Sequence, residues 1–180
     1  MKEKKTIILG ISGSIAAFKS AELASRLVQK GFRVKVIMTE AAEKFITPLT
    51  LQVLSCNKVY RGMFEDLDAW EVEHVSLADS ANIVLIAPAT ANCLGKIASG
   101  ICDDLLTCVV TATKAPVLIA PAMNDGMYEN KIVQENIGRL KKSGYHFVGP
   151  VKGRLACGRV SVGRMSDVDD ILESVSRLVR

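Results

Sequence analysis

The sequence predicts an α/β protein in which a doubly wound parallel sheet is the middle of three layers, as in Rossmann-like folds. Several short runs are apolar throughout, which is typical of parallel strands buried on both faces. Segments with helical periodicity alternate with these runs, and this alternation favours helices on both sides of one sheet. The length of 180 residues suits one full-sized core, so we expect residues 1–180 to form a single domain.

In the first half of the chain, glycine and proline residues separate the expected elements. Gly10 ends the first apolar run, Gly31 follows a long amphipathic segment as a C-terminal cap, and Pro48 separates two short helical pieces. Residues 56–73, which include the only tryptophan, Trp70, show no regular pattern. The pattern predicts strands at 6–9 and 33–38 and helices at 15–30, 41–45 and 50–55.

The second half repeats the alternation of apolar runs and amphipathic segments. Pro88 and Pro121 each follow an apolar run, Gly144 ends a helical segment, and Ser166 is the expected cap of the last helix. The pattern predicts strands at 83–87, 117–120 and 146–148 and helices at 76–80, 103–113, 128–142 and 167–179.

Composition narrows the class of protein and of ligand. Apolar residues make up 49% and charged residues 23%, and no apolar run reaches the ~18 residues that cross a bilayer, so we expect a cytoplasmic protein without membrane contact. Five cysteines without a CxxC pair and only two histidines favour free thiols over a metal site. The net charge of +4 without a basic run favours small anionic ligands over nucleic acid.

Polar and small residues gather where four of the predicted strands end. Ligands of doubly wound sheets bind outside the carboxyl ends of the strands, so these segments are the candidate binding site. The four segments are 10–15, 38–40, 88–96 and 121–124.

The segment GISGSIAAFK opens the first predicted helix. Gly13 and Ser14, together with the free N–H groups at the start of that helix, favour a bound phosphate, although a plain strand–helix turn is the alternative. The spacing matches neither GxGxxG nor a Walker A loop, which favours a single phosphate over a pyrophosphate. Thr39 can hydrogen-bond the same ligand, and Glu40 leaves NAD open as a second possibility.

Two further strand ends carry short polar side chains among small residues. In PATANCLGK, Thr90 can bind a phosphate oxygen and Asn92 can cap the next helix, or the segment is simply a capped turn. In PAMNDGM, Asn124 can bind a carboxylate or amide, with a helix N-cap as the alternative. Met123 and Met127 supply an adaptable apolar surface there.

A histidine and a cysteine are the remaining candidates for chemistry. His74, preceded by Glu71 and Glu73, can serve as a general base, although a lone histidine is more often structural. Cys157 lies in VKGRLACGRVSVGRM, a loop-like segment of glycines and arginines that suits an anionic ligand. The alternative is a solvated surface loop with an incidental thiol.

Taken together, SGSIAA, His74, PATANCLGKIASGICDDLL, PAMN and LACG…GRM resemble the flavin-containing cysteine decarboxylases over nearly the whole chain. The resemblance implies a Rossmann-like flavoprotein with FMN as cofactor. It also implies decarboxylation of 4′-phospho-N-pantothenoylcysteine to 4′-phosphopantetheine in coenzyme A biosynthesis, through a thioaldehyde and an enethiolate.

The resemblance further implies a role for each matching residue. His74 becomes the catalytic base, Asn124 the ligand of the substrate carboxylate and Cys157 the proton donor. The implied FMN phosphate ligands are Gly13, Ser14 and Ile15, with Thr39 nearby. The implied contacts of the flavin are Thr90, Ala91, Asn92, Cys93 and Ala122. The implied substrate contacts in a mobile flap are Arg154, Leu155 and Ala156.

Assembly and partners also follow from the resemblance. It implies a homotrimer, which in this branch often assembles into a dodecamer, with FMN near a subunit interface. A separate phosphopantothenoylcysteine synthetase, a protein that is fused to such enzymes in many bacteria, is a candidate partner. Two residues depart from the family pattern, namely Tyr128 in place of tryptophan and Arg159 in place of the usual aspartate. The candidates for the substrate phosphate are Lys141, Lys142, Lys152 and Arg164.

Three other functions are compatible with parts of the pattern. A peptidyl-cysteine decarboxylase of lantibiotic maturation shares the histidine and PxMN, but such enzymes typically lack the LACG flap. A flavin prenyltransferase shares the fold, but its arginine-rich prenyl-phosphate site is not apparent. A non-catalytic flavin-binding regulatory subunit has no need of His74, Asn124 and Cys157 together.

Overall fold

A parallel sheet forms the centre of the protein, as the sequence predicts. It has six strands instead of the five predicted, because Val59–Tyr60 forms a short strand in the stretch 56–73, where the sequence shows no regular pattern. The computed structural model describes residues 4–63 and 72–179, so Trp70 and Glu71 lie outside the described residues. The strand order is β3-β2-β1-β4-β5-β6, and neighbouring strands pair in parallel. The strands are β1 Thr6–Ile11, β2 Arg33–Met38, β3 Val59–Tyr60, β4 Ile83–Ala89, β5 Val117–Pro121 and β6 His146–Phe147.

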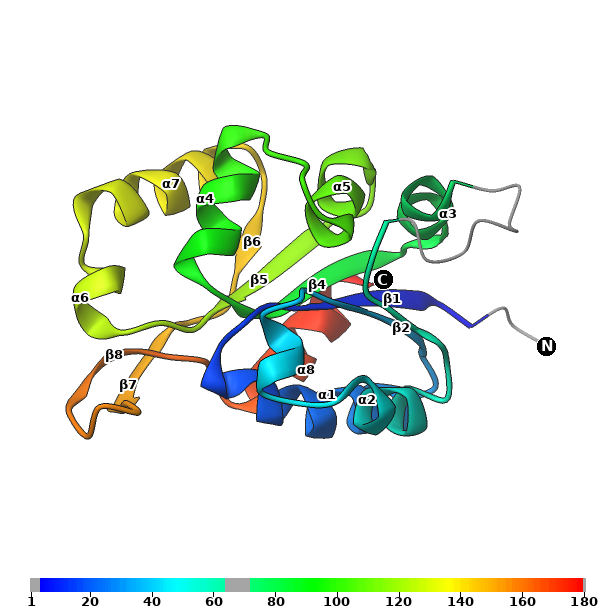
Figure 1. The fold of residues 1–180 in the computed structure, drawn as a ribbon, viewed down its shortest axis with the longest axis horizontal. Helices are drawn as coiled ribbons and strands as arrows, with labels where there is room; N and C mark the ends of the chain where they lie inside the picture. The colour runs from blue at the N-terminus through cyan, green and yellow to red at the C-terminus, as the bar shows by residue number, and fades with distance from the viewer. Residues whose placement is uncertain (1–3, 64–71, 180) are drawn as a thin grey trace.

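Helices cover both faces of this sheet and complete the three layers (Figure 1). Side chains alternate along β1, so that Ile7 and Leu9 pack with the first group of helices and Ile8 with the second. The first group is α1 Phe18–Gln29, α2 Pro48–Ser55 and α8 Val168–Leu178. The second group is α3 Glu73–Ser80, α4 Ala91–Ser99, α5 Leu105–Ala112 and α7 Lys131–Lys142. No helix in these described parts is both long and apolar enough to cross a membrane.

Several boundaries differ from the predicted ones because side-chain caps decide where helices begin. Residues 91–99 form a helix that the pattern did not predict, and its N-cap is Thr90 rather than Asn92. The predicted helix at 128–142 begins only at Lys131, as α7, because Asn130 caps it by accepting a hydrogen bond from the Ile132 N–H at 2.9 Å. Tyr128 instead ends a separate short helix, α6 Asp125–Tyr128. The first predicted helix begins as a 3₁₀ turn, η1 Ile15–Ala17, and a second such turn is η2 Ala42–Lys44.

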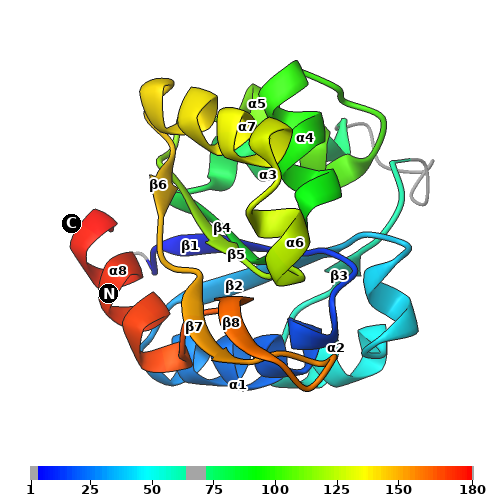
Figure 2. The same cartoon turned by 90° about the vertical axis from the view of Figure 1, so that its left-hand side faces the viewer.

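The prediction that residues 151–165 form a loop is wrong. Strands β7 Val151–Arg154 and β8 Val160–Arg164 pair as an antiparallel hairpin outside the main sheet and beside α6 (Figures 1 and 2). The Met123 N–H donates to the carbonyl of Gly163 at 3.0 Å, which ties β8 to the end of β5. Gly163 has a φ of 142°, and an added Cβ would lie 2.3 Å from the Met123 carbonyl oxygen, so this close approach requires glycine.

The last helix also begins differently from the prediction. Asp167, not Ser166, is the N-cap of α8, and its side chain makes no capping hydrogen bond. Ser166 is buried just before the helix, and Asp167 uses its carboxylate for two ion pairs instead.

Candidate active site

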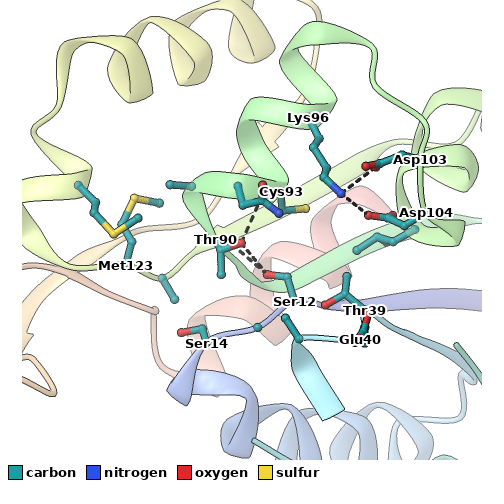
Figure 3. Close-up of a pocket in the computed structure, with 17 residues that line it drawn as sticks. Ser12, Ser14, Thr39, Glu40, Thr90, Cys93, Lys96, Asp103, Asp104 and Met123 are labelled. Atoms are coloured by element: carbon teal, nitrogen blue, oxygen red, sulfur yellow. Dashed lines mark hydrogen bonds and ion pairs between the residues drawn. The ribbon is translucent and has the colours of Figure 1, made fainter. Parts of the chain in front are cut away.

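The first cavity, of about 640 Å³, lies at the carboxyl ends of the central strands. β1 and β4 are neighbours here although they are not consecutive, which makes this the point where the strand order reverses. All four predicted strand-end segments contribute to its wall (Figure 3). The predicted cofactor residues that line this cavity are Gly13, Ser14, Thr39, Thr90, Ala91, Asn92, Cys93 and Ala122.

The turn between β1 and α1 offers two unused backbone donors. The Ser14 N–H donates to the Ser12 carbonyl at 2.9 Å, whereas the N–H groups of Gly13 and Ile15 have no acceptor among the described residues. An added Cβ on Gly13 would lie 2.4 Å from Cβ of Ala41, so only glycine lets this turn pack against the end of β2. Two free N–H groups before a helix suit an anion such as a phosphate.

Ser12 joins the ends of β1 and β4. Its hydroxyl donates to the Pro88 carbonyl at 2.8 Å and accepts from the Thr90 N–H at 3.0 Å. Thr90 Oγ1 in turn accepts from the Cys93 N–H at 3.3 Å as the N-cap of α4. Ser12 is 2% exposed, so its hydroxyl is structural, and Thr90 can still donate its own hydroxyl hydrogen into the cavity.

An ion-pair cluster on one wall of this cavity was not predicted. Lys96 Nζ lies 2.7 Å from Asp103 Oδ1 and 3.0 Å from Asp104 Oδ2 (Figure 3). Asp104 also caps α5 in a capping box with Thr107. The sequence signal was present, because an aspartate directly before the apolar run of 105–110 is a typical N-cap.

Cys93 forms part of the wall as a buried thiol. It is 4% exposed, and burial, reinforced by the Asp104 carboxylate, raises its pKa to about 12. A thiol with such a pKa stays protonated at neutral pH, so Cys93 can contact a ligand but is not a nucleophile.

A second cavity, of about 670 Å³, adjoins the first and shares Ser14, Ala122 and Met123 with it. The predicted substrate residues and Ile15 meet here, although they come from the start of the chain, the end of β5 and the hairpin. The predicted residues in this wall are Ile15, Asn124, Arg154, Leu155, Ala156 and Cys157.

Asn124 and Cys157 face each other in the second cavity. Asn124 Oδ1 accepts a hydrogen bond from the Gly126 N–H at 2.9 Å, which makes Asn124 the N-cap of α6. This bond orients the amide, and its Nδ2 lies 3.9 Å from Sγ of Cys157. Asn124 therefore caps a helix, which confirms one of the two sequence interpretations. Its Nδ2 lies in the second cavity, and the binding of a carboxylate by this group stays a prediction.

Arg159, where the family pattern has aspartate, pairs the hairpin with α6. Its Nη2 lies 2.5 Å from Oδ1 of Asp125, and the charges of Asp125 and then Cys157 raise the pKa of the guanidinium. The ion pair holds the loop that carries Cys157 against the helix that Asn124 caps.

His74 lies apart from this arrangement. It is half-buried in the first turn of α3 and lines neither cavity in the parts of the chain that are described. Val72 and Val75 beside it are exposed apolar residues. One chain by itself therefore does not bring His74 to Asn124 and Cys157.

Known proteins resemble this chain in sequence and in fold. The Flavoprotein family model matches residues 1–180. A coenzyme A biosynthesis bifunctional protein CoaBC of Borreliella burgdorferi is 48% identical over 97% of this chain, which spans 45% of that relative's length. A probable phosphopantothenoylcysteine decarboxylase of Streptococcus mutans is 46% identical over 95% of this chain and 97% of its own. This chain thus spans less than half of the bifunctional relatives that it matches.

One solved structure with the same fold is a complex with a small molecule. It is a PPC decarboxylase with a cysteine-to-serine change, complexed with pantothenoylaminoethenethiol. The TM-score is 0.88 at 32% identity, over 97% of this chain and 98% of that one.

Proposed function

We propose that this chain, which belongs to the flavoprotein family, uses FMN to decarboxylate 4′-phospho-N-pantothenoylcysteine. The product would be 4′-phosphopantetheine, an intermediate of coenzyme A biosynthesis. A relative of nearly the same length is a probable phosphopantothenoylcysteine decarboxylase, which supports the substrate. The observation that carries the proposal is the pair of adjoining cavities, the second of which contains Asn124 Nδ2 and Cys157 Sγ 3.9 Å apart.

The first cavity fits FMN in size and in chemistry. Its volume of about 640 Å³ lies in the usual range for cofactor sites, and its walls between Thr90 and Cys93 are small side chains that leave room for a flat ring. The free N–H groups of Gly13 and Ile15 would hold the phosphate. When bound, the cofactor supplies reversible two-electron chemistry that makes loss of CO₂ from the substrate possible.

Asn124 would hold the substrate carboxylate with its Nδ2 hydrogens. A neutral donor suits this step, because a cation at the same position would stabilise the carboxylate that has to leave as CO₂. The capping bond from the Gly126 N–H keeps the amide oxygen turned away from the negatively charged group.

Cys157 would give a proton to the substrate carbon after CO₂ has left. The role is supported by the position of the thiol opposite Asn124, because a carboxylate held by Asn124 would have its carbon near Cys157. The hairpin that carries Cys157 would also keep water from the enethiolate, which solvent would otherwise protonate without control.

His74 is proposed as the catalytic base only in an assembly. Because it lines neither cavity of its own chain in the described residues, it can act only if a neighbouring subunit presents it to the site. We therefore propose a homotrimer in which the exposed Val72 and Val75 beside it pack against a neighbour. A cytoplasmic location and a separate or fused synthetase partner belong to the same proposal.

The test is turnover by purified protein. We expect a yellow chromophore, release of CO₂ from 4′-phospho-N-pantothenoylcysteine and formation of 4′-phosphopantetheine, followed by mass spectrometry. Cys157→Ser should still release CO₂ but accumulate the enethiol, as the compound bound to the solved relative suggests. Flavin without CO₂ release would refute the proposed reaction, and full product formation by Cys157→Ser would refute the role of Cys157.

A further inference from the structure

The substrate of the proposed reaction carries a phosphate at the end remote from its thiol, and that group needs a binding site. Of the four sequence candidates, Lys141 and Lys142 lie in the last turn of α7 and Lys152 is exposed on β7. None of these three lines the second cavity, whereas Arg164 does. The fold therefore selects one candidate from the four.

Arg164 belongs to a cluster in which one carboxylate holds two cations. Arg164 Nη2 lies 2.8 Å from Oδ2 of Asp167, and Lys19 Nζ lies 3.1 Å from Oδ1 of the same residue. The hydrogen bond from Lys19, with the charge of Arg164, lowers the pKa of Asp167, so the carboxylate is ionised at neutral pH. Asp167 thus fixes cations from α1 and β8 at the wall of one cavity.

The cluster keeps binding capacity that Asp167 does not use. Asp167 takes only the Nη2 of Arg164; the Nε is buried against Gly153, and the Nη1 is accessible and has no hydrogen-bond partner among the described residues. Arg154, in the same wall, has no ion pair or side-chain hydrogen bond within the described residues. Lys19, Arg154 and Arg164 with one carboxylate leave an excess of two positive charges, which matches a phosphate dianion.

The two cavities differ in the sign of their charge. The first has Glu40, Asp103 and Asp104 against Lys96, whereas the described lining of the second contains no carboxylate. An anionic group on the substrate is therefore favoured in the second cavity and disfavoured at the Lys96 wall of the first.

We propose that the substrate phosphate binds between Arg164 and Lys19, with Arg154 as a further contact and Asp167 as the residue that positions the two cations. This inference rests on the proposed function, because it names the binding site for one part of that substrate. Charge-assisted hydrogen bonds from arginine to phosphate are strong and directional, so loss of Arg164 should be selective for the phosphorylated compound.

The test compares 4′-phospho-N-pantothenoylcysteine with N-pantothenoylcysteine for wild type, Arg164→Gln and the control Lys152→Gln. Glutamine can still donate to Asp167. The measured quantity is kcat/KM for the phosphorylated substrate divided by kcat/KM for the unphosphorylated one. We expect Arg164→Gln to lower this ratio by about ten- to a hundred-fold, and Lys152→Gln to leave it near the wild-type value. An unchanged ratio, or an equal loss for both substrates in Arg164→Gln, would overturn the proposal.

Two further measurements distinguish a failure of the phosphate site from a failure of the proposed function. FMN affinity, measured by flavin fluorescence, should be the same in Arg164→Gln and wild type, and weaker FMN binding would assign the cluster to the cofactor instead and overturn the proposal. If wild type turned over neither compound, the proposed function would fail. Calorimetric binding of 4′-phosphopantetheine and pantetheine would then still decide whether Arg164 selects the phosphate.

Discussion

At the scale of single residues, some polar atoms of the site bond within the protein and others face a cavity. Asn124 accepts with Oδ1 from the Gly126 N–H and presents Nδ2 towards Cys157. Ser12 satisfies its hydroxyl within the protein by donating to the Pro88 carbonyl, although it lies in a strand-end segment of the candidate site. Residue type therefore indicated the site, while the hydrogen-bond partners show which atoms remain for a ligand.

Asn124→Asp tests the neutral donor. Aspartate caps helices as well as asparagine does, so α6 should form and FMN should remain bound. The new charge would repel the substrate carboxylate, and we expect kcat/KM to fall at least a hundred-fold. Steady-state kinetics and the flavin spectrum measure the two effects, and normal turnover would show that Asn124 does not hold the carboxylate.

The two cysteines at the site should differ in reactivity. With a pKa of about 12, Cys93 is only about 10⁻⁴ thiolate at pH 8, whereas Cys157 is exposed. We expect iodoacetamide at pH 8 to modify Cys157 in the native protein and to leave Cys93 unmodified, as peptide mass spectrometry would show. Equal modification of both thiols would contradict the buried environment of Cys93.

At the scale of elements, helix caps and the hairpin decide how the site is built. Thr90, Asp104 and Asn124 each begin a helix at the edge of a cavity, so the same short polar residues both end loops and line the site. The hairpin is held by the Met123–Gly163 backbone bond and by the Arg159–Asp125 ion pair.

Arg159→Asp would place two like charges together and should loosen the hairpin. An ion pair at the surface contributes little, so we expect cleavage near Leu155 in limited proteolysis to become only roughly two- to fivefold faster. Arg159→Gln should have a smaller effect, and Arg159→Asp combined with Asp125→Arg should restore the slow rate. No change in Arg159→Asp would show that the ion pair does not hold the hairpin.

Asp104→Ala tests the capping box of α5. Burial alone would raise the pKa of Asp104, but hydrogen bonds from Thr107 and Lys96 outweigh it and lower the pKa. The stabilisation is therefore present above the unfolded pKa of about 3.9 and is lost as the pH falls through the folded value.

Urea unfolding at pH 7 should show a loss of about 1 kcal/mol in Asp104→Ala, and the difference from wild type should shrink below about pH 4. Asp103→Ala is the matched control, because Asp103 contacts Lys96 but caps no helix, and its loss should be smaller. A pH-independent difference would contradict the ionised cap.

At the scale of the whole molecule, the sheet places two cavities of opposite charge side by side. The first lies at the carboxyl ends of the neighbouring strands β1 and β4, and the second lies between α1 and the hairpin. A cofactor and an anionic substrate can thus occupy neighbouring spaces that share Ser14, Ala122 and Met123.

FMN should stabilise the flavin-free protein more than riboflavin does. At a hundred times its Kd, FMN adds about 2.7 kcal/mol, which raises Tm by roughly 5–11 °C in a chain of this size. Riboflavin lacks the phosphate, so its shift at equal concentration should be smaller. Gly13→Ala should remove most of the difference, whereas Gly138→Ala, with open space around it, should not. Equal shifts for both flavins would refute the phosphate site at Gly13.

The sequence by itself determined the fold class and the segments that carry the site. Burial patterns are local, so apolar runs and amphipathic segments identified the main strands and their carboxyl ends, including those at Thr90 and Asn124. The sequence patterns did not reveal the hairpin, because β7 and β8 contain glycines and charged residues and pack outside the core. Only the tertiary structure brought Asn124 to Cys157, Lys19 to Asp167 and Ser12 to Thr90. Contacts between residues so far apart along the chain depend on strand order and layer packing, which no local pattern encodes.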